Sequence, residues 1–292
     1  MTPEELQAYL RDHPAPLFYG AFLFFGSLVS LFLLANFLRR RRRLDAPAVG
    51  NWPIGGLDFG LFLVALLLWF ILSGAVISTL YRQFGDTETP PGALTTVLGG
   101  FLLQGGMLYL FLRFRFHYRK PEEGPLSPQL FSLPAAMLAG LACCLASLPV
   151  VYAVGAGWNL FLEFLRSRGF PVELPMQEAV LLFQEASHPL VLAGLLVLAV
   201  VVAPVVEELV FRAGVYRFLK GRTSRVLALL ISGLLFGIIH GNLQSLPGLV
   251  AVGVCLGLAY EITGNLRVPI FFHAFFNLNS ILWIQLLPDT LS

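Results

Sequence analysis

Long apolar runs dominate this sequence, and they restrict the chain to a fold that crosses a membrane. Hydrophobic residues make up 57% of the 292 residues and charged residues only 12%, whereas an average soluble domain is about one quarter charged. A helix needs about 20 apolar residues to cross a bilayer. We therefore predict an all-α fold, a polytopic transmembrane helical bundle of about eight spans. The predicted spans are 17–38, 58–80, 93–112, 133–158, 189–220, 226–243, 248–260 and 268–287.

The chain divides into two parts by the depth of its polar residues. Residues 1–188 contain four predicted spans and then a connector, 159–188, in which Phe and Leu alternate with Glu and Arg. That pattern is typical of an interfacial amphipathic segment, or of a loop interrupted by Pro171 and Pro175. Residues 189–287 form the second predicted part, a membrane core with charged residues inside its spans.

Basic residues predict the orientation of the spans, because Lys and Arg collect in cytoplasmic loops. With the N-terminus outside, 14 of the 19 basic residues fall in cytoplasmic loops, and four fall outside. We therefore expect both termini on the outer side. The seventh span is short and rich in glycine, and a re-entrant path there would move the C-terminus to the inside.

Three charged residues lie within six positions of an otherwise apolar run: Glu207, Glu208 and Arg212. A charge at bilayer depth costs about 2.5–3.5 kcal/mol on insertion scales, so such residues are rare and usually functional. Two other apolar segments each contain one deep histidine, His240 and His273. We interpret these five residues as one site.

Helix geometry predicts how these side chains group. A helix rises about 1.5 Å per residue, which places Glu207 and His240 at similar depths, roughly 20 Å above the turn at 221–224. Residues four apart share a helix face. His273 and Asn277 therefore share one face, and Glu208 is expected to pair with Arg212.

The same residues resemble three motifs of one intramembrane family. The family contains type II CAAX prenyl endopeptidases and bacteriocin-processing or immunity proteins (the CPBP family). Its motifs are EExxxR, FxxxH, and a histidine followed four residues later by Asn or Asp. They correspond here to Glu207, Glu208 and Arg212, to Phe236 and His240, and to His273 and Asn277. The resemblance covers about residues 189–285, and residues 1–188 resemble only generic membrane helices.

The resemblance implies an intramembrane endopeptidase with a CAAX-protease-like catalytic core at 189–287. Glu207 and His240 would activate a water, and His273 and Asn277 would form the oxyanion hole. Glu208, Arg212 and Phe236 would support them. An apolar site suits a glutamate acting as general base, and neutral His and Asn side chains can donate to a developing oxyanion.

Metal dependence is left open by the sequence. The HExxH helix of common zinc proteases is absent, and we predict that no metal or other cofactor is bound. Two histidines and a carboxylate could nevertheless hold zinc with one open position. A metal-dependent version of the same protease is therefore an alternative.

Two further alternatives are non-enzymatic. One is a silent relative that serves as a scaffold or a bacteriocin-immunity protein; the intact set of Glu207, His240, His273 and Asn277 argues against it. The other is a proton-coupled transporter, which would be expected to show broken helices in both halves of the chain. The predicted partners are membrane lipid and a peptide or protein substrate, reached from the membrane or the cytoplasmic side, with no nucleic acid. The predicted location is the inner (plasma) membrane of a bacterium, as a multi-pass protein.

Overall fold

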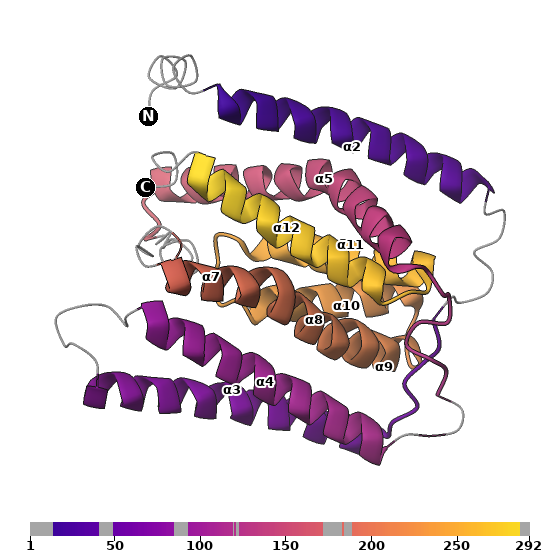
Figure 1. The fold of residues 1–292 in the computed structure, drawn as a ribbon, viewed down its shortest axis with the longest axis vertical. Helices are drawn as coiled ribbons and strands as arrows, with labels where there is room; N and C mark the ends of the chain where they lie inside the picture. Colours follow the sequence, from indigo (N-terminus) through magenta and orange to yellow (C-terminus); the bar gives the residue numbers. More distant parts are fainter. Residues whose placement is uncertain are drawn as a thin grey trace.

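The protein is described by a computed structural model that places residues 14–40, 49–84, 93–118, 120, 123–171, 183 and 189–286. All of the regular secondary structure in these residues is helical. The helices are α2 (Ala15–Arg40), α3 (Gly56–Phe84), α4 (Ala93–His117), α5 (Leu133–Ser167), α7 (Pro189–Val197), η1 (Leu198–Val202), α8 (Ala203–Glu208), η2 (Leu209–Tyr216), α9 (Arg217–Lys220), α10 (Arg225–Ile238), α11 (Leu246–Thr263) and α12 (Arg267–Leu286). They run side by side as a bundle (Figure 1).

The all-helical, multi-span fold predicted from the sequence is confirmed. Every predicted span is a helix, and α7 to α9 form one continuous path from Pro189 to Lys220. By length and apolarity, six of the described helices can cross a membrane: α2, α3, α4, α5, the α7–α9 path and α11. Helix α10 is shorter, and α12 carries the polar His273 and Asn277.

Two predicted boundaries need correction. Helix α5 does not end near residue 158 but continues to Ser167, so the first third of the predicted connector is helix; residues 172–182 and 184–188 of that connector lie outside the described residues. The sixth span ends at Ile238, five residues earlier than predicted. Gly241 adopts a φ of 63° there, a left-handed conformation that glycine adopts without a Cβ clash.

The path through α7 to α9 changes its winding around the two adjacent glutamates. Pro204 lies in the first turn of α8 and has no N–H to donate, and the helix before α8 widens into the π-helical segment η1. A second π-helical segment, η2, follows Glu208. Such segments are rare in α-helices and often occur at functional sites.

Glycines bring α10 and α11 into close contact. A Cβ on Gly253 would lie 2.8 Å from the Cα of Gly233, and a Cβ on Gly233 would lie 3.0 Å from the carbonyl oxygen of Val250. Small residues let membrane helices approach at backbone distance. The contact has a direct consequence for the site, because it determines the position of the Gly253 carbonyl.

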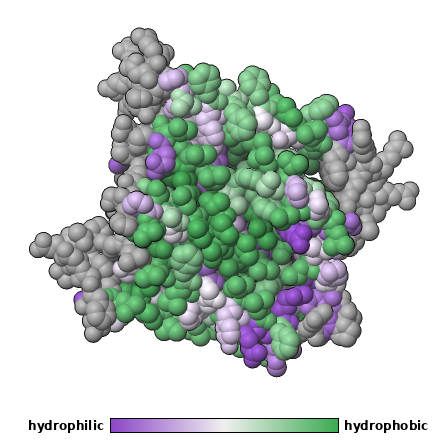
Figure 2. Space-filling model, viewed as in Figure 1, coloured by the Kyte–Doolittle hydropathy of each residue, from purple (hydrophilic) through white to green (hydrophobic). Residues whose placement is uncertain are grey.

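The outer surface of the bundle is apolar. Large hydrophobic side chains are exposed along α2 and α3, among them Phe22, Phe32, Leu67 and Phe70. In Figure 2 the visible face is mostly hydrophobic, with hydrophilic side chains mainly toward its margins. A surface of this kind fits a lipid environment, and the protein is a multi-pass membrane protein.

The connections at one end of the bundle are joined through buried basic side chains. Arg217 is fully buried and donates to the carbonyl oxygens of Gly50, Asn51 and Gly124, and pairs with Glu123 at 3.2 Å. Lys220 pairs with Glu261 at 2.6 Å. The first residue of α2 and the last of α12 both lie at the opposite end (Figure 1). The helical path therefore begins and ends on one side of the bundle, as an even number of crossings requires.

Candidate active site

The polar residues predicted from the motifs come from four segments of the bundle. Helix α8 supplies Glu207 and Glu208, η2 supplies Arg212, and α12 supplies His273 and Asn277. Four of these side chains are buried: Glu207, Glu208, Arg212 and His273. His240 lies in the turn after α10, and its side chain is open to the space beside it.

The predicted pair of Glu208 and Arg212 is present. Nη1 of Arg212 lies 2.9 Å from Oε1 of Glu208, and both side chains are completely buried. Nη2 donates to the Gly253 carbonyl oxygen at 2.8 Å. The guanidinium also lies over the Phe236 ring, 4.6 Å from its centroid, where the electron-rich face attracts a cation. Arg212 thus joins η2 to α10 and α11.

His273 lies between the two adjacent glutamates. Its Nδ1 is 3.0 Å from Oε1 of Glu208, and its Nε2 is 3.9 Å from Oε2 of Glu207. An ionised carboxylate only accepts hydrogen bonds, so the Nδ1 proton is donated to Glu208. The neutral ring then presents an unprotonated Nε2 toward Glu207. The result is a buried chain from Arg212 through Glu208 and His273 to Glu207.

Gln104 on α4 completes this chain, and the motifs did not predict it. Its Nε2 donates to Oε1 of Glu207 at 2.9 Å, and its side chain is buried. A lone amide within the apolar span of α4 was the available signal. It identifies a polar residue at depth but not its partner, which lies 103 positions later in the chain.

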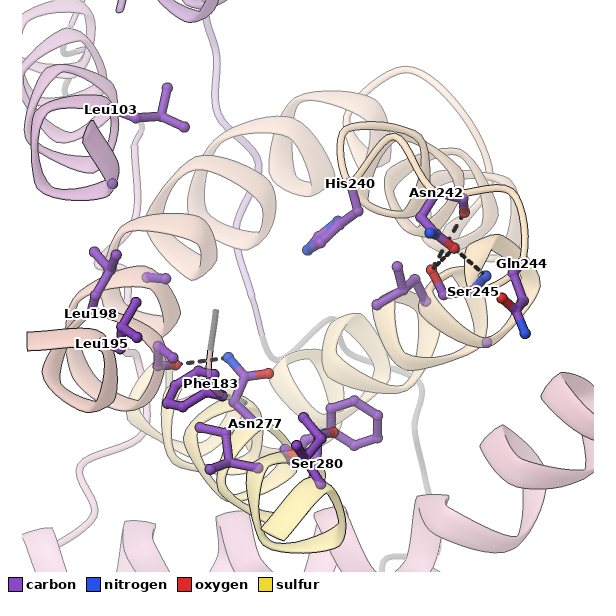
Figure 3. Close-up of a pocket in the computed structure, with 18 of the residues that line it drawn as sticks. Leu103, Phe183, Leu195, Leu198, His240, Asn242, Gln244, Ser245, Asn277 and Ser280 are labelled. Atoms are coloured by element: carbon purple, nitrogen blue, oxygen red, sulfur yellow. Dashed lines mark hydrogen bonds between the residues drawn. The ribbon is translucent and has the colours of Figure 1, made fainter. Parts of the chain in front are cut away.

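A cavity of about 1160 Å³ adjoins this chain of residues. It is lined by His240 and Asn277 from the predicted site, together with Gln104 and Ala203 from the two segments that hold Glu207. Figure 3 shows His240 and Asn277 on facing sides of the open space, with Asn242, Gln244 and Ser245 along the turn after His240. The cavity is wide enough for several residues of a peptide, since small-molecule sites measure about 300–1,000 Å³.

The hydrogen bonds of His240 and Asn277 determine which groups they present to the cavity. Nδ1 of His240 is 2.7 Å from the carbonyl oxygen of Phe236, and a carbonyl only accepts, so this nitrogen carries the proton. A neutral His240 therefore has a free lone pair on Nε2. Nδ2 of Asn277 donates one proton to the Ala199 carbonyl oxygen at 2.8 Å, which leaves its second N–H.

Two predicted groupings differ in the structure. Glu207 was expected beside His240, but the histidine that approaches it in the described structure is His273. His273 and Asn277 were expected to aim at one atom, yet one bonds to Glu208 and the other to Ala199. The predicted contacts depended on how each helix is rotated toward its neighbours, and that rotation differs from the one expected.

A metal-binding cluster is not formed by the residues that the structure describes: they contain no group of three or more His, Cys, Asp or Glu side chains that could hold a metal ion. Cys143, Cys144 and Cys255 are free thiols within α5 and α11. Metal independence remains a prediction.

The fold and site define a class of protein: a polytopic membrane protein with a buried acid–histidine chain beside an intramembrane cavity. Comparison with known proteins shows which family this part of the chain resembles. Residues 189–279 match the family model for type II CAAX prenyl endopeptidase Rce1-like proteins. The match covers less than half of the chain and agrees with the resemblance predicted from the three motifs.

Three curated relatives align with the same part of the chain. YdiL of Bacillus subtilis, a candidate membrane peptidase by name, is 34% identical over 83 residues, or 28% of this chain and 34% of its own length. The membrane-embedded CAAX protease MroQ of Staphylococcus aureus is 30% identical over 97 residues, or 31% of this chain and 39% of its own. An uncharacterised protein of Mycoplasma capricolum is 33% identical over 93 residues, or 30% of this chain and 27% of its own.

The alignments thus span well under half of each relative. No solved structure matches the chain. The bacterial relatives, together with the six candidate spans, agree with the predicted location, a multi-pass protein of the bacterial plasma membrane.

Proposed function

We propose that the protein is an intramembrane endopeptidase that hydrolyses a peptide bond in the cavity beside Glu207. The observation that carries the proposal is the placement of one buried carboxylate, Glu207, between the Gln104 amide and the His273 ring, next to a cavity lined by His240 and Asn277. The match to the CAAX-endopeptidase family supports the reaction class.

The proposed first step is attack by water on the peptide carbonyl. Glu207 takes one proton of the water as its oxygen bonds to the carbonyl carbon, and the π electrons of the carbonyl move onto its oxygen. The free Nε2 of His240 accepts a hydrogen bond from the remaining O–H and takes that second proton when the product carboxyl group ionises. General bases of this kind contribute about 10²–10⁴-fold. The C–N bond then breaks, and the leaving nitrogen takes a proton from the protonated base. The products are a carboxylate and an amine.

The proposed oxyanion donors are His273 and Asn277. Asn277 keeps one N–H after its bond to Ala199 and can turn it toward a carbonyl oxygen in the cavity. His273 donates from Nδ1 to Glu208, so it can donate from Nε2 only when it is protonated. The oxyanion role of His273 therefore requires that it holds, while the oxyanion exists, the proton that Glu207 took from water; Glu207 lies 3.9 Å away. That proton returns through Glu207 to the leaving nitrogen when the C–N bond breaks.

The test is a comparison of membrane proteomes. Cells that make the wild-type protein, Glu207→Gln or Glu163→Gln are compared for shifted protein termini. Glu163 is an exposed glutamate on α5 outside the site and serves as the matched control. We expect new termini with the wild type and Glu163→Gln but not with Glu207→Gln. Identical termini in all three strains would favour a non-catalytic scaffold or immunity protein.

The metal-dependent alternative is tested on the purified protein. A metal-free mechanism through Glu207 and His240 predicts that prolonged chelation with phenanthroline leaves cleavage of an identified substrate unchanged. Loss of cleavage that returns on adding Zn²⁺ would establish the metal-dependent version.

A further inference from the structure

The cavity lies in one half of the bundle only. On α12 its lining runs from Phe276 to Ile284, which is about 13–26 Å from Arg267 along the helix axis. On α4 the lining residues Gly99 to Gln104 lie about 17–24 Å from Arg115. Since the apolar core of a bilayer is about 30 Å thick, the cavity occupies the half remote from these arginines.

Helices α10 and α5 place the cavity in the same half of the bundle. Helix α10 rises about 20 Å from Arg225 to Ile238, and the cavity begins beyond its end, at His240. On α5 the lining residues Val151 to Asn159 lie about 27 Å or more from Leu133, where that helix begins. Four helices from different parts of the chain therefore place the cavity at the end where α2 begins and α12 ends (Figure 1).

The opposite end of the bundle carries most of the positive charge. Ten of the Lys and Arg residues that the structure describes lie in or beside the four connections at this end, and three, Arg82, Arg166 and Arg168, lie at the other end. Among those described, Arg217 and Lys220 are bound into the network with Glu123 and Glu261. Cytoplasmic connections collect Lys and Arg, so this end faces the cytoplasm, and the cavity faces the other side.

The lining itself restricts what can occupy the cavity. The residues that line it in the described structure include no Asp, Glu, Lys or Arg. Apart from the residues of the site, their polar side chains are amides and hydroxyls, from Ser73, Ser78, Tyr152, Asn159, Asn242, Gln244, Ser245 and Ser280. Uncharged donors and acceptors match the backbone of an extended peptide. Away from Glu207, a charged side chain would find no counter-ion among the described lining residues, and burying such a charge is costly.

We propose that the cavity takes up its peptide from the outer face of the membrane, and that the substrate is a membrane-proximal segment without charged side chains, exposed at that face. This proposal adds a substrate class to the proposed function, and it depends on that function only in calling the peptide a substrate. The side from which the cavity is reached is independent of catalysis. It differs from the expectation, made from the sequence, that the substrate is reached from the membrane or the cytoplasmic side.

The first experiment measures access without using activity. The native cysteines are replaced by Ala or Ser, and single cysteines are introduced as Gln244→Cys in the cavity and Gln129→Cys at the basic end, where that side chain is exposed. Intact cells are treated with a membrane-impermeant maleimide before and after permeabilisation. We expect Gln244→Cys to react in intact cells and Gln129→Cys only after permeabilisation.

The reverse pattern would overturn the proposal, as would a Gln244→Cys thiol that reacts only after permeabilisation or not at all. Repeating the labelling in a Glu207→Gln background separates access from function. If labelling follows the expected pattern while the purified wild-type protein cuts nothing, the proposed function fails and the access route stands.

The second experiment tests the substrate class. Once a cleaved segment is known, matched peptides carry Ser, Lys or Asp at the residues that flank the cut. We expect kcat/KM to fall about tenfold or more for Lys and Asp relative to Ser, because a charge without a partner is costly to bury. Equal cleavage of all three peptides would contradict an uncharged substrate.

Discussion

At the scale of single residues, the two adjacent glutamates of the site have different partners and therefore different roles. Glu208 bonds to both Arg212 and His273 and is completely buried. Glu207 bonds to the uncharged Gln104, which lines the cavity. Glu208, which neutralises Arg212, thus stabilises the fold, whereas Glu207 is available to act as a general base.

This assignment predicts opposite effects of two similar substitutions. Glu208→Gln and Arg212→Ala each leave a buried charge without its partner, which should cost about 3–5 kcal/mol. Glu207→Gln keeps the shape of the side chain and breaks no ion pair with a permanently charged group, so it should remove cleavage and leave stability nearly unchanged. Thermal unfolding in detergent, measured beside cleavage, checks all three. If Glu207→Gln is unstable and Glu208→Gln is stable but inactive, the roles of the two glutamates are the reverse of those assigned here.

Gln104 permits a second prediction at this scale. Gln104→Leu removes the donor to Oε1 of Glu207 while keeping an apolar side chain of similar size. A hydrogen bond to a charged group contributes about 1.5–3 kcal/mol, so kcat should fall about 10–100-fold if Glu207 must be held in place. Gln129→Leu, an exposed glutamine elsewhere in the chain, is the matched control. Unchanged turnover in Gln104→Leu would remove Gln104 from the site.

The proposed oxyanion donors are tested in the same assay. Removing one such donor usually lowers kcat by about 10²–10³, and we expect this for His273→Ala and for Asn277→Ala, with KM changing little. Loss of binding with turnover intact would instead make Asn277 part of a recognition surface.

At the scale of helices, the sequence predicted elements well and their mutual rotation poorly. The apolar runs predict α2 to α5 directly, because a helix needs about 20 apolar residues to cross a bilayer. The Glu208–Arg212 pair follows from helix periodicity alone. The contacts of Glu207 with Gln104 and His273 join helices that are distant in sequence, and nothing in one segment specifies how another turns to meet it. His240 also lies outside its predicted helix, because Gly241 ends α10 early.

Close packing of α10 on α11 gives a prediction at this scale. A Cβ on Gly253 would meet the Cα of Gly233 at 2.8 Å and its carbonyl oxygen at 3.0 Å, so Gly253→Ala should push the helices apart. The Gly253 carbonyl accepts from Arg212, and the shift should therefore lower both stability and cleavage, by about 1–3 kcal/mol in stability. Gly60→Ala on α3 has nothing within 4 Å of the added Cβ and is the control. Equal melting temperatures for the two variants would contradict the packing argument.

At the scale of the whole molecule, the two predicted parts of the chain, 1–188 and 189–287, both contribute residues to the candidate active site and to the basic end of the bundle. The family match covers only residues 189–279, yet Glu207 is held by Gln104 from α4. Arg217 is held by Glu123 and by backbone carbonyls of the connections before α3 and α5. The generic helices of the first part thus supply partners that the motifs of the second part require.

This arrangement predicts that the second part cannot work alone. A fragment of residues 189–292 would lack the donor to Glu207 and would expose a buried arginine, Arg217, without its acceptors, so we expect it to be unstable in detergent and inactive. Co-expression with residues 1–188 should restore a complex that purifies through a tag on either fragment and regains cleavage. Adding Arg217→Gln should weaken that complex, because the side chain loses its charge-assisted bond to Glu123. A fragment 189–292 that is stable and cleaves without its partner would show that the family segment is a self-sufficient enzyme and that α2 to α5 serve another purpose.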